Sequence, residues 1–236
     1  MRSRPALVSA LDGLFPEPVK PVNLGDHAYE HLRELILSRQ IVGGDEVPES
    51  KLAERLQVSR TPMREALVRL IGEGLLERAN ARTYRVRAVS TREFFECMQL
   101  RELLEGYAIE CAVPLIKDAD LVALRQRLQE LGGGDDDDMQ HWRFDNAFHS
   151  FFARVVGHDT LAETITRMRV TARLFRISSV FHRKAEIDEE HLAIIEAAER
   201  RDVPAAKAAM QAHLRNLQDH VRRAIAAETD PAGHFR

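Results

Sequence analysis

The chain has 236 residues, of which 44% are hydrophobic and 30% charged, and its formal net charge is −3. That length suits one large or two small domains, and no apolar run approaches the roughly 20 residues that a membrane-spanning helix needs. Glycine, proline and strand-like stretches are scarce, so we expect a mainly α-helical protein. Cys97 and Cys111 form no CxxC pair, which is typical of reduced thiols in the cytoplasm.

The charge is spread unevenly along the chain. Residues 50–89 hold nine Lys or Arg against four Asp or Glu, a balance of +5, whereas residues 90–236 hold 20 against 25, a balance of −5. A basic segment joined to an acidic one is typical of a DNA-reading domain attached to another module. The excess is small, and chance alone can produce it.

The N-terminal part of the chain predicts a tail followed by one helix. Residues 1–22 contain an apolar patch, but acidic and proline residues interrupt it, so we expect a loose tail rather than a signal peptide. A first helix is predicted over 26–39, because apolar residues recur there at helical spacing. These residues are Tyr29, Leu32, Leu35 and Ile36. The sequence GGDEVP that follows indicates a loop.

A short helix and a tight turn are predicted next, over residues 49–58. The apolar stripe of this helix consists of Leu52, Ala53 and Leu56. Ser50 or Glu49 is a suitable N-cap, because either side chain can accept a hydrogen bond from a free backbone N–H group. The turn falls on residues 57–58.

A second helix follows the turn and ends near Gly74. Ser59 is a good N-cap for it, and Pro62 lies in its first turn, where the missing N–H loses no intrahelical bond. Gly74 is a typical residue for a helix C-terminus. The predicted inward face consists of Ala66, Leu67, Leu70 and Ile71.

The N-terminal end of this second helix carries positive and hydroxyl side chains on a different face. Arg60, Thr61 and Arg64 share that face, at positions i, i+1 and i+4. Such a helix can enter the major groove of DNA with its N-terminal residues against base edges. Arginine pairs with guanine through two hydrogen bonds, and threonine bonds bases or phosphates. The pattern favours a helix-turn-helix, although an ordinary amphipathic hairpin with a solvated basic face has the same spacing.

A short hairpin is predicted after the second helix. Tyr84, Val86 and Ala88 alternate with arginines, as in a half-buried strand. Asn80 lies where the hairpin would turn. A β-hairpin in this position is a wing, and Arg82 at its tip could reach the minor groove or a phosphate.

The segment GGDEVPESKLAERLQVSRTPMREALVRLIGEGLLE resembles the winged helix-turn-helix of the GntR family of transcription factors, above all in SRTPMREAL. The resemblance covers nearly all of residues 24–89. It implies DNA contacts by Ser59, Arg60, Thr61 and Arg64, with Arg82 in the wing. Two positions depart from the family pattern. Ser50 stands where some members have a base-contacting arginine, and Thr83 stands where the wing tip usually carries glycine.

Residues from 90 onward predict one helix after another, without an internal repeat, a Gly-rich phosphate loop or a Ser–His–Asp order. The expected helices cover residues 91 to about 114, 118–131, 141–156, 161–180, 187–200 and 203–228. The stretch GGGDDDD between the second and third is interpreted as a flexible, solvated loop. An acidic metal cluster there would lack the necessary geometry.

Four residues in these helices are candidate metal ligands. Asp145 and His149 are four residues apart on one predicted helix and so face the same way. His191 lies early on a second helix, and His213 shares an apolar stripe on a third. One carboxylate and three imidazoles in a helical bundle suit a borderline divalent ion such as Zn²⁺, Ni²⁺ or Mn²⁺. The chain has ten histidines, however, and His213 could equally be a core residue.

A second resemblance bears on these residues. DNAFH, EHLAIIEAAERRD and MQAHL resemble the all-helical FCD effector domain of the FadR-type GntR regulators, over most of residues 93–225. It implies that Asp145, His149, His191 and His213 bind a metal inside the bundle. It also places Arg101 near the effector cavity. A buried guanidinium needs an anionic partner. That partner is either the carboxylate of a small organic acid or, in a structural ion pair, Glu102, Glu105 or a distant acid.

Together these observations predict a mainly α fold with an N-terminal winged helix-turn-helix over 23–89 and a C-terminal antiparallel helical bundle over 90–228. Tails over 1–22 and 229–236 flank the two domains. We expect a transcription regulator, a repressor rather than an enzyme, that binds a palindromic operator in double-stranded DNA as a homodimer. It would sense a small organic acid through its metal site. The alternatives are a metal-sensing regulator and a metal-dependent hydrolase, for which no general base has motif support.

Overall fold

The computed structural model describes residues 24–132, 138–175 and 183–229, so the predicted N-terminal tail, most of the C-terminal tail and most of the GGGDDDD loop lie outside it. The chain divides into two compact units. Among the described residues, one unit contains 24–94 and 167–175, and the other contains 95–132, 138–166 and 183–229. The fold is mainly helical with a small sheet, as predicted.

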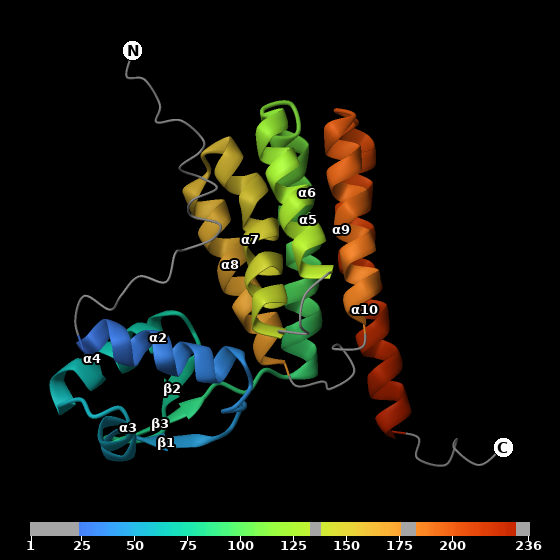
Figure 1. Cartoon of the computed structure of the whole chain (residues 1–236). Coiled ribbons are helices and arrows are strands. Elements are labelled where there is room, and N and C mark those ends of the chain that lie inside the picture. The colour runs from blue at the N-terminus through green and yellow to red at the C-terminus, as the bar shows by residue number, and fades with distance from the viewer. Residues whose placement is uncertain (1–23, 133–137, 176–182, 230–236) are drawn as a thin grey trace. The chain divides into compact units, whose positions relative to one another are not determined.

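The first unit is a helix-turn-helix with a three-stranded antiparallel sheet (Figure 1). Its elements are α2 (Leu24–Leu37), β1 (Glu46–Pro48), α3 (Glu49–Arg55), α4 (Arg60–Gly72), β2 (Leu76–Arg78) and β3 (Thr83–Val86). In the order β1-β3-β2, Val47 pairs with Tyr84 and Leu76 pairs with Val86. Strands β2 and β3 form the predicted wing.

Strand β1 corrects the prediction of a plain loop over GGDEVP. It is three residues long and has no alternation that a sequence pattern could reveal. Its pairing with β3, 35 or more positions further along the chain, creates it. Pro48 is tolerated because this strand lies at the edge of the sheet, where the missing N–H costs no ladder bond.

The ends of α3 and α4 agree only in part with the predicted caps. Pro48, not Ser50 or Glu49, is the N-cap of α3, and it makes no side-chain cap bond. Ser59 is the N-cap of α4 as predicted, also without a side-chain bond. After α4, Gly74 adopts φ +74° and its amide bonds the carbonyl of Ile71 at 2.9 Å, so the predicted stop is confirmed. Only glycine adopts this left-handed conformation without strain.

The core of the first unit follows most of the predicted apolar faces, but Leu35 and Leu56 are only partly buried, and Ala88 is exposed and lies beyond the end of β3. Helices α2 and α4 pack together. Their fully or almost fully buried residues include Leu32, Ile36, Met63, Ala66, Leu67 and Leu70. Ile71, which we expected to face inward, is exposed. It lies about 100° around the helix from Leu70, beyond the edge of the buried stripe.

The second unit is a bundle of helices that run alongside one another (Figure 1), and it includes α5 from Phe95 onward and α8 up to Thr166. The helices after the wing are α5 (Thr91–Ala112), α6 (Asp118–Gly132), α7 (Asp138–Val156), α8 (Asp159–Leu174), α9 (Lys184–Glu199) and α10 (Val203–Thr229). Their order is as predicted, although α7 begins three residues early. Helix α8, predicted to reach residue 180, ends at Leu174, and residues 176–182 lie outside the described ranges.

The bundle core is mainly apolar but contains a cluster of buried ionisable groups. Its buried side chains include Ile109, Leu121, Leu124, Phe148, Phe151, Phe152, Ile194, Ile195 and Met210. The polar side chains buried in the same unit include Arg101, Glu105, His149, His191 and His213. Buried ionisable groups are expensive unless they are paired or bind an ion, so this cluster requires a specific explanation. Within the described ranges, no helix is both long and apolar enough to cross a membrane.

Candidate DNA-reading surface and candidate metal centre

At the N-terminal end of α4, the inner face packs into the core and the outer face is exposed to solvent. Met63, the first buried residue of the helix, has no exposed surface. The predicted DNA contacts Ser59, Arg60, Thr61 and Arg64 are all exposed. The helix N-terminus adds a partial positive charge at the same place. This surface can therefore meet a polyanion without unfolding any packed element.

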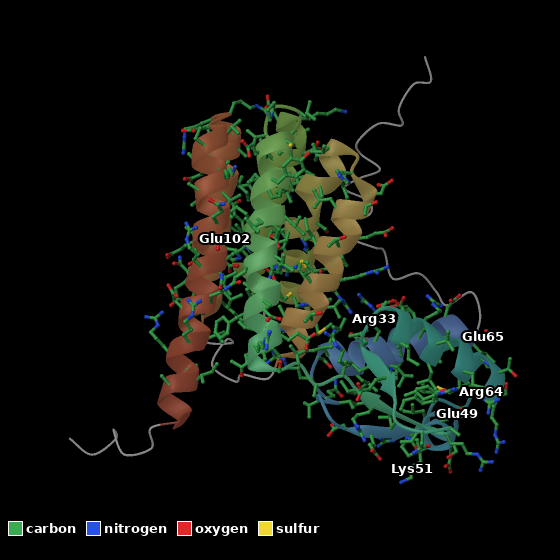
Figure 2. The ribbon with its side chains drawn as sticks, turned by 180° about the vertical axis from the view of Figure 1, so that it is seen from behind. Arg33, Glu49, Lys51, Arg64, Glu65 and Glu102 are labelled. Carbon is green, nitrogen blue, oxygen red and sulfur yellow. The ribbon has the colours of Figure 1, made fainter. Side chains whose placement is uncertain are left out.

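Arg64 is exposed and also oriented by an acidic residue. Its Nε donates a hydrogen bond to Oε1 of Glu49 at 2.9 Å, and Figure 2 shows the two side chains close together. The side chain of Arg64 is 59% exposed and that of Glu49 only 7%. Because only Nε is engaged in this contact, the terminal nitrogens of Arg64 are presented outward.

The same glutamate also contacts the wing. The backbone amide of Glu49 donates to the carbonyl of Arg82 at 3.1 Å. Arg82 is exposed, and its own amide bonds the side chain of Asn80 at 3.0 Å, as expected of a turn residue. Glu49 thus ties the recognition helix to the wing. Sequence reasoning considered it only as a cap, because no local pattern links it to residues 15 and 33 positions away.

The four predicted metal ligands come together inside the bundle. Helix α7 supplies Asp145 and His149 one turn apart, α9 supplies His191 and α10 supplies His213. One ligand atom from each lies within 4.8 Å of the others. The three imidazoles are buried and the carboxylate is partly exposed.

The spacing of these atoms matches that around a small divalent ion. Asp145 Oδ1 lies 3.3 Å from Nε2 of His149 and 3.3 Å from Nε2 of His191, and these two nitrogens are 3.4 Å apart. Donors placed tetrahedrally on bonds of about 2.0–2.1 Å would be about 3.3–3.4 Å from one another. The donor types of the four residues and the separations of these three donors therefore fit a transition-metal ion.

Two glutamates fix the orientation of two of these rings. Nδ1 of His149 contacts Oε2 of Glu105, and Nδ1 of His213 lies 2.8 Å from Oε2 of Glu190. A carboxylate on Nδ1 selects the tautomer in which Nε2 has a free lone pair. Nε2 of His149 faces Asp145 and His191, and the bond to Glu190 leaves Nε2 as the nitrogen of His213 that could bind a metal. Neither glutamate was predicted as a ring partner, since Glu105 is 44 positions from its histidine.

The environment keeps His213 neutral and Glu190 charged. Burial lowers the pKa of His213, which outweighs the opposing hydrogen bond to Glu190. Burial raises the pKa of Glu190, but hydrogen bonds with His213 and Asn216 and the charge of Arg183 bring it below its usual value. A neutral imidazole beside a carboxylate is the state in which histidine ligates metals.

Arg101 forms the buried ion pair that was one of its two predicted roles. Its Nε donates to Oε1 of Glu105 at 2.6 Å. Its NH1 lies 3.4 Å from the sulfur of Met98, and its NH2 is buried without a hydrogen-bond partner among the described residues. The pairing therefore leaves one donor group of the guanidinium unused.

The two units match two known protein families. A family described as bacterial regulatory proteins, gntR family, matches residues 24–86, and the FCD domain matches residues 96–216. The chain belongs to the GntR family and carries an FCD domain. The match agrees with the exposed recognition helix of one unit and the helical bundle of the other.

Similar proteins extend over most of this GntR-family chain. An HTH-type transcriptional regulator of Streptomyces ambofaciens is 29% identical over 197 residues, 83% of this chain and 84% of that one. The transcriptional repressor RspR of Escherichia coli is 26% identical over 211 residues, 87% and 91% of the two chains. The Glc operon transcriptional activator of E. coli is 24% identical over 219 residues, 81% and 86%.

The fold also matches a solved structure. E. coli McbR/YncC aligns with a TM-score of 0.70 at 22% identity, over 86% of this chain and 99% of that one. Family and relatives together identify a DNA-binding transcription regulator and not an enzyme. The metal-dependent hydrolase that the sequence left open is therefore excluded.

Proposed function

We propose that this GntR-family regulator is a repressor whose DNA binding responds to a small organic acid, through a metal site in the FCD domain. The exposed N-terminal end of α4 is the observation that supports DNA binding. Arg60 and Arg64 would read guanines, while Ser59 and Thr61 bond bases or phosphates. Arg82 in the wing would contact a phosphate or the minor groove. RspR, a repressor similar to this chain, supports the proposed repressor role.

A homodimer would place two recognition helices on a palindromic operator. Two-fold symmetric dimers bind half-sites about one helical turn apart, roughly 34 Å. Helix α5 offers a candidate contact, because Leu100, Leu103 and Tyr107 form an exposed apolar stripe on one face. Monomeric proteins rarely expose such stripes. Leu103→Asp should convert the dimer to monomers in sedimentation velocity, while wild-type protein sediments as a dimer.

The metal would be Zn²⁺, Ni²⁺ or Mn²⁺, held by Asp145, His149, His191 and His213. Imidazole and carboxylate ligands suit each of these ions. When bound, the ion supplies a positive charge for an organic acid, whose second anchor would be the unused donor group of Arg101. Because Arg101 is buried, the acid can enter only if the bundle opens locally. An acid that binds one arrangement of the regulator more tightly than another shifts DNA affinity by that difference.

A gel-shift experiment with the promoter region of the regulator's own gene tests the proposal. Metal-loaded protein should retard this DNA at low salt, and an unrelated duplex of the same length should be bound much more weakly. An absence of retardation at low salt would remove the proposal. Transcription from the same promoter should fall when the protein is added, and a rise would contradict the repressor role.

Metal sensing is the alternative that one observation favours. Three of the four donors lie 3.3–3.4 Å from one another, and the donor of His213 lies within 4.8 Å of them, so the protein could supply four ligands without an organic one. Titrating metal in the absence of organic acid separates the two functions. A large change in operator affinity with metal alone favours the sensor. A change that appears only after an organic acid is added favours the metabolite-responsive regulator.

A further inference from the structure

Glu105 on α5 contacts two functional residues through its two oxygens. Its Oε1 accepts the 2.6 Å hydrogen bond from Nε of Arg101, and its Oε2 contacts Nδ1 of His149. The side chains of Arg101, Glu105 and His149 are 3%, 0% and 0% exposed. One buried carboxylate thus joins the candidate anion-binding residue to a candidate metal ligand.

Stability alone does not explain this arrangement. A buried ion pair contributes about as much as well-packed apolar residues of the same size, because desolvation cancels most of the attraction. The pair here is also incompletely satisfied, since NH2 of Arg101 has no hydrogen-bond partner among the described residues. Unsatisfied buried groups are typical of functional sites rather than of optimised cores.

A similar chain on the other side of the cluster provides a comparison within the molecule. Arg183 NH2 bonds Oε1 of Glu190 at 2.5 Å, and Oε2 of Glu190 bonds His213. Glu190 receives an additional hydrogen bond from Asn216 at 2.7 Å and is 17% exposed, so water and a neutral amide share its charge. Glu105 is fully buried and contacts both Arg101 and His149, so a change at either should be felt at the other.

We propose that Glu105 is a positioning residue that orients His149 for metal and couples metal binding to anion binding at Arg101. This inference rests on the metal site of the proposed function. An anion that draws Arg101 away from Oε1 leaves the carboxylate a stronger acceptor for the N–H group of His149. A stronger acceptor makes imidazole a better ligand, so the anion raises the affinity for metal. By linkage, the metal raises the affinity for the anion by the same factor.

Titration of metal-free, full-length protein with Co²⁺, with and without acetate, tests the proposal. Co²⁺ reports ligand geometry through its visible absorption, and acetate is a simple carboxylate. Glu105→Gln should lower the Co²⁺ affinity by about 10- to 100-fold and alter the visible spectrum. Acetate should tighten Co²⁺ binding in the wild type and do so less in Glu105→Gln. Any direct bond between acetate and the ion persists in the variant, so the difference measures the path through Glu105.

Two further variants keep the test decisive if Glu105→Gln folds poorly. Arg101→Met leaves the Glu105–His149 contact in place, so it should bind Co²⁺ but respond less to acetate than the wild type does. Glu190→Gln is the matched control, because it also removes a carboxylate from a ligand histidine. It should weaken Co²⁺ binding but retain the acetate response. Circular dichroism and melting of the metal-free variants check that each one folds.

The outcomes separate this inference from the proposed function. Wild-type affinity and spectrum in Glu105→Gln would overturn the orienting role, and an acetate response equal to that of the wild type in Glu105→Gln and Arg101→Met would overturn the coupling. If the wild type bound Co²⁺ and these effects were absent, the inference alone would fail. If the wild type bound no Co²⁺, the metal site of the proposed function would fail with it.

Discussion

Two arginine–glutamate pairs, one in each unit, show how solvent exposure changes the use of the same chemistry. Arg64 and Glu49 pair at the recognition helix, where the arginine side chain is 59% exposed and the glutamate 7%. Arg101 and Glu105 pair inside the bundle, where both side chains are at most 3% exposed. The first glutamate orients an arginine that remains available to a partner in water. The second holds an arginine that only a ligand entering the bundle can reach.

The difference predicts how each region responds to its surroundings. Exposed charges act on DNA over the Debye length, about 8 Å at physiological ionic strength, and salt weakens them. Buried charges are screened much less, so the bundle cluster should respond to the loss of one partner rather than to salt.

The largest expected effect is on the buried side. His149→Ala removes one of four ligands, so the Co²⁺ affinity should fall by more than the roughly 10- to 100-fold typical of partners outside the ligand set. Calorimetric titration measures the change. The matched control is His27→Ala, which removes an exposed histidine of α2 and should leave the Co²⁺ affinity unchanged. Equal affinities in His149→Ala and wild type would show that the cluster is not the metal site.

Metal should also stabilise the fold through the same residues. An ion that binds the native state at a free concentration 100 times its Kd adds about 2.7 kcal/mol to the free energy of unfolding. The melting temperature of wild-type protein should therefore rise when Zn²⁺ is added and return when a chelator removes it. His149→Ala should show a much smaller rise. A wild-type melting temperature insensitive to metal would contradict the site.

On the exposed side, Arg60→Ala and Arg64→Ala should each weaken operator binding. A bidentate arginine–guanine contact contributes about 1–3 kcal/mol, or roughly 5- to 150-fold in affinity. Fluorescence anisotropy with a labelled operator measures the loss. Arg127→Ala, which removes a partly exposed arginine of α6, controls for net charge and should bind as the wild type does. Losses of the same size for all three variants would mean that overall charge, not the helix tip, determines affinity.

The sequence predicted what repeats locally and missed what depends on distant pairing. Helical spacing identified the buried face of α4, and the i, i+4 pair Asp145 and His149 was correctly placed on one helix face. Strand β1 escaped notice, because only its pairing with β3 makes it a strand. The roles of Glu49 and Glu105 could not be predicted either. Their partners lie 15 and 44 positions away, and no local period connects them.

Removal of the Glu49 charge should weaken operator binding less than removal of Arg60 or Arg64 does. Glu49→Gln keeps the shape of the side chain but removes the charge that orients Arg64. Partly exposed ion pairs contribute about 0.2–1 kcal/mol, so operator affinity should fall by about 1.5- to 5-fold. Combining Glu49→Gln with Arg64→Ala should add little to Arg64→Ala alone. Fully additive losses would show that Glu49 acts on DNA binding independently of Arg64.

The smallest expected effect belongs to the wing. Arg82→Ala should weaken binding to all sequences alike, because a phosphate contact carries no base information. The slope of log affinity against log salt should become shallower by about one. A change in the preferred operator sequence instead would mean that Arg82 reads bases.

The central claim is that the exposed tip of α4 reads DNA sequence. Its most direct test compares the wild type with the Arg60→Ala/Arg64→Ala double variant on a palindromic site from the protein's own promoter and on a scrambled duplex, at one fixed salt concentration. The account predicts that the wild type prefers the palindrome strongly and that the double variant loses most of this preference while retaining weak binding to both. A wild type that binds the two duplexes equally, or a double variant that keeps the full preference, would contradict it.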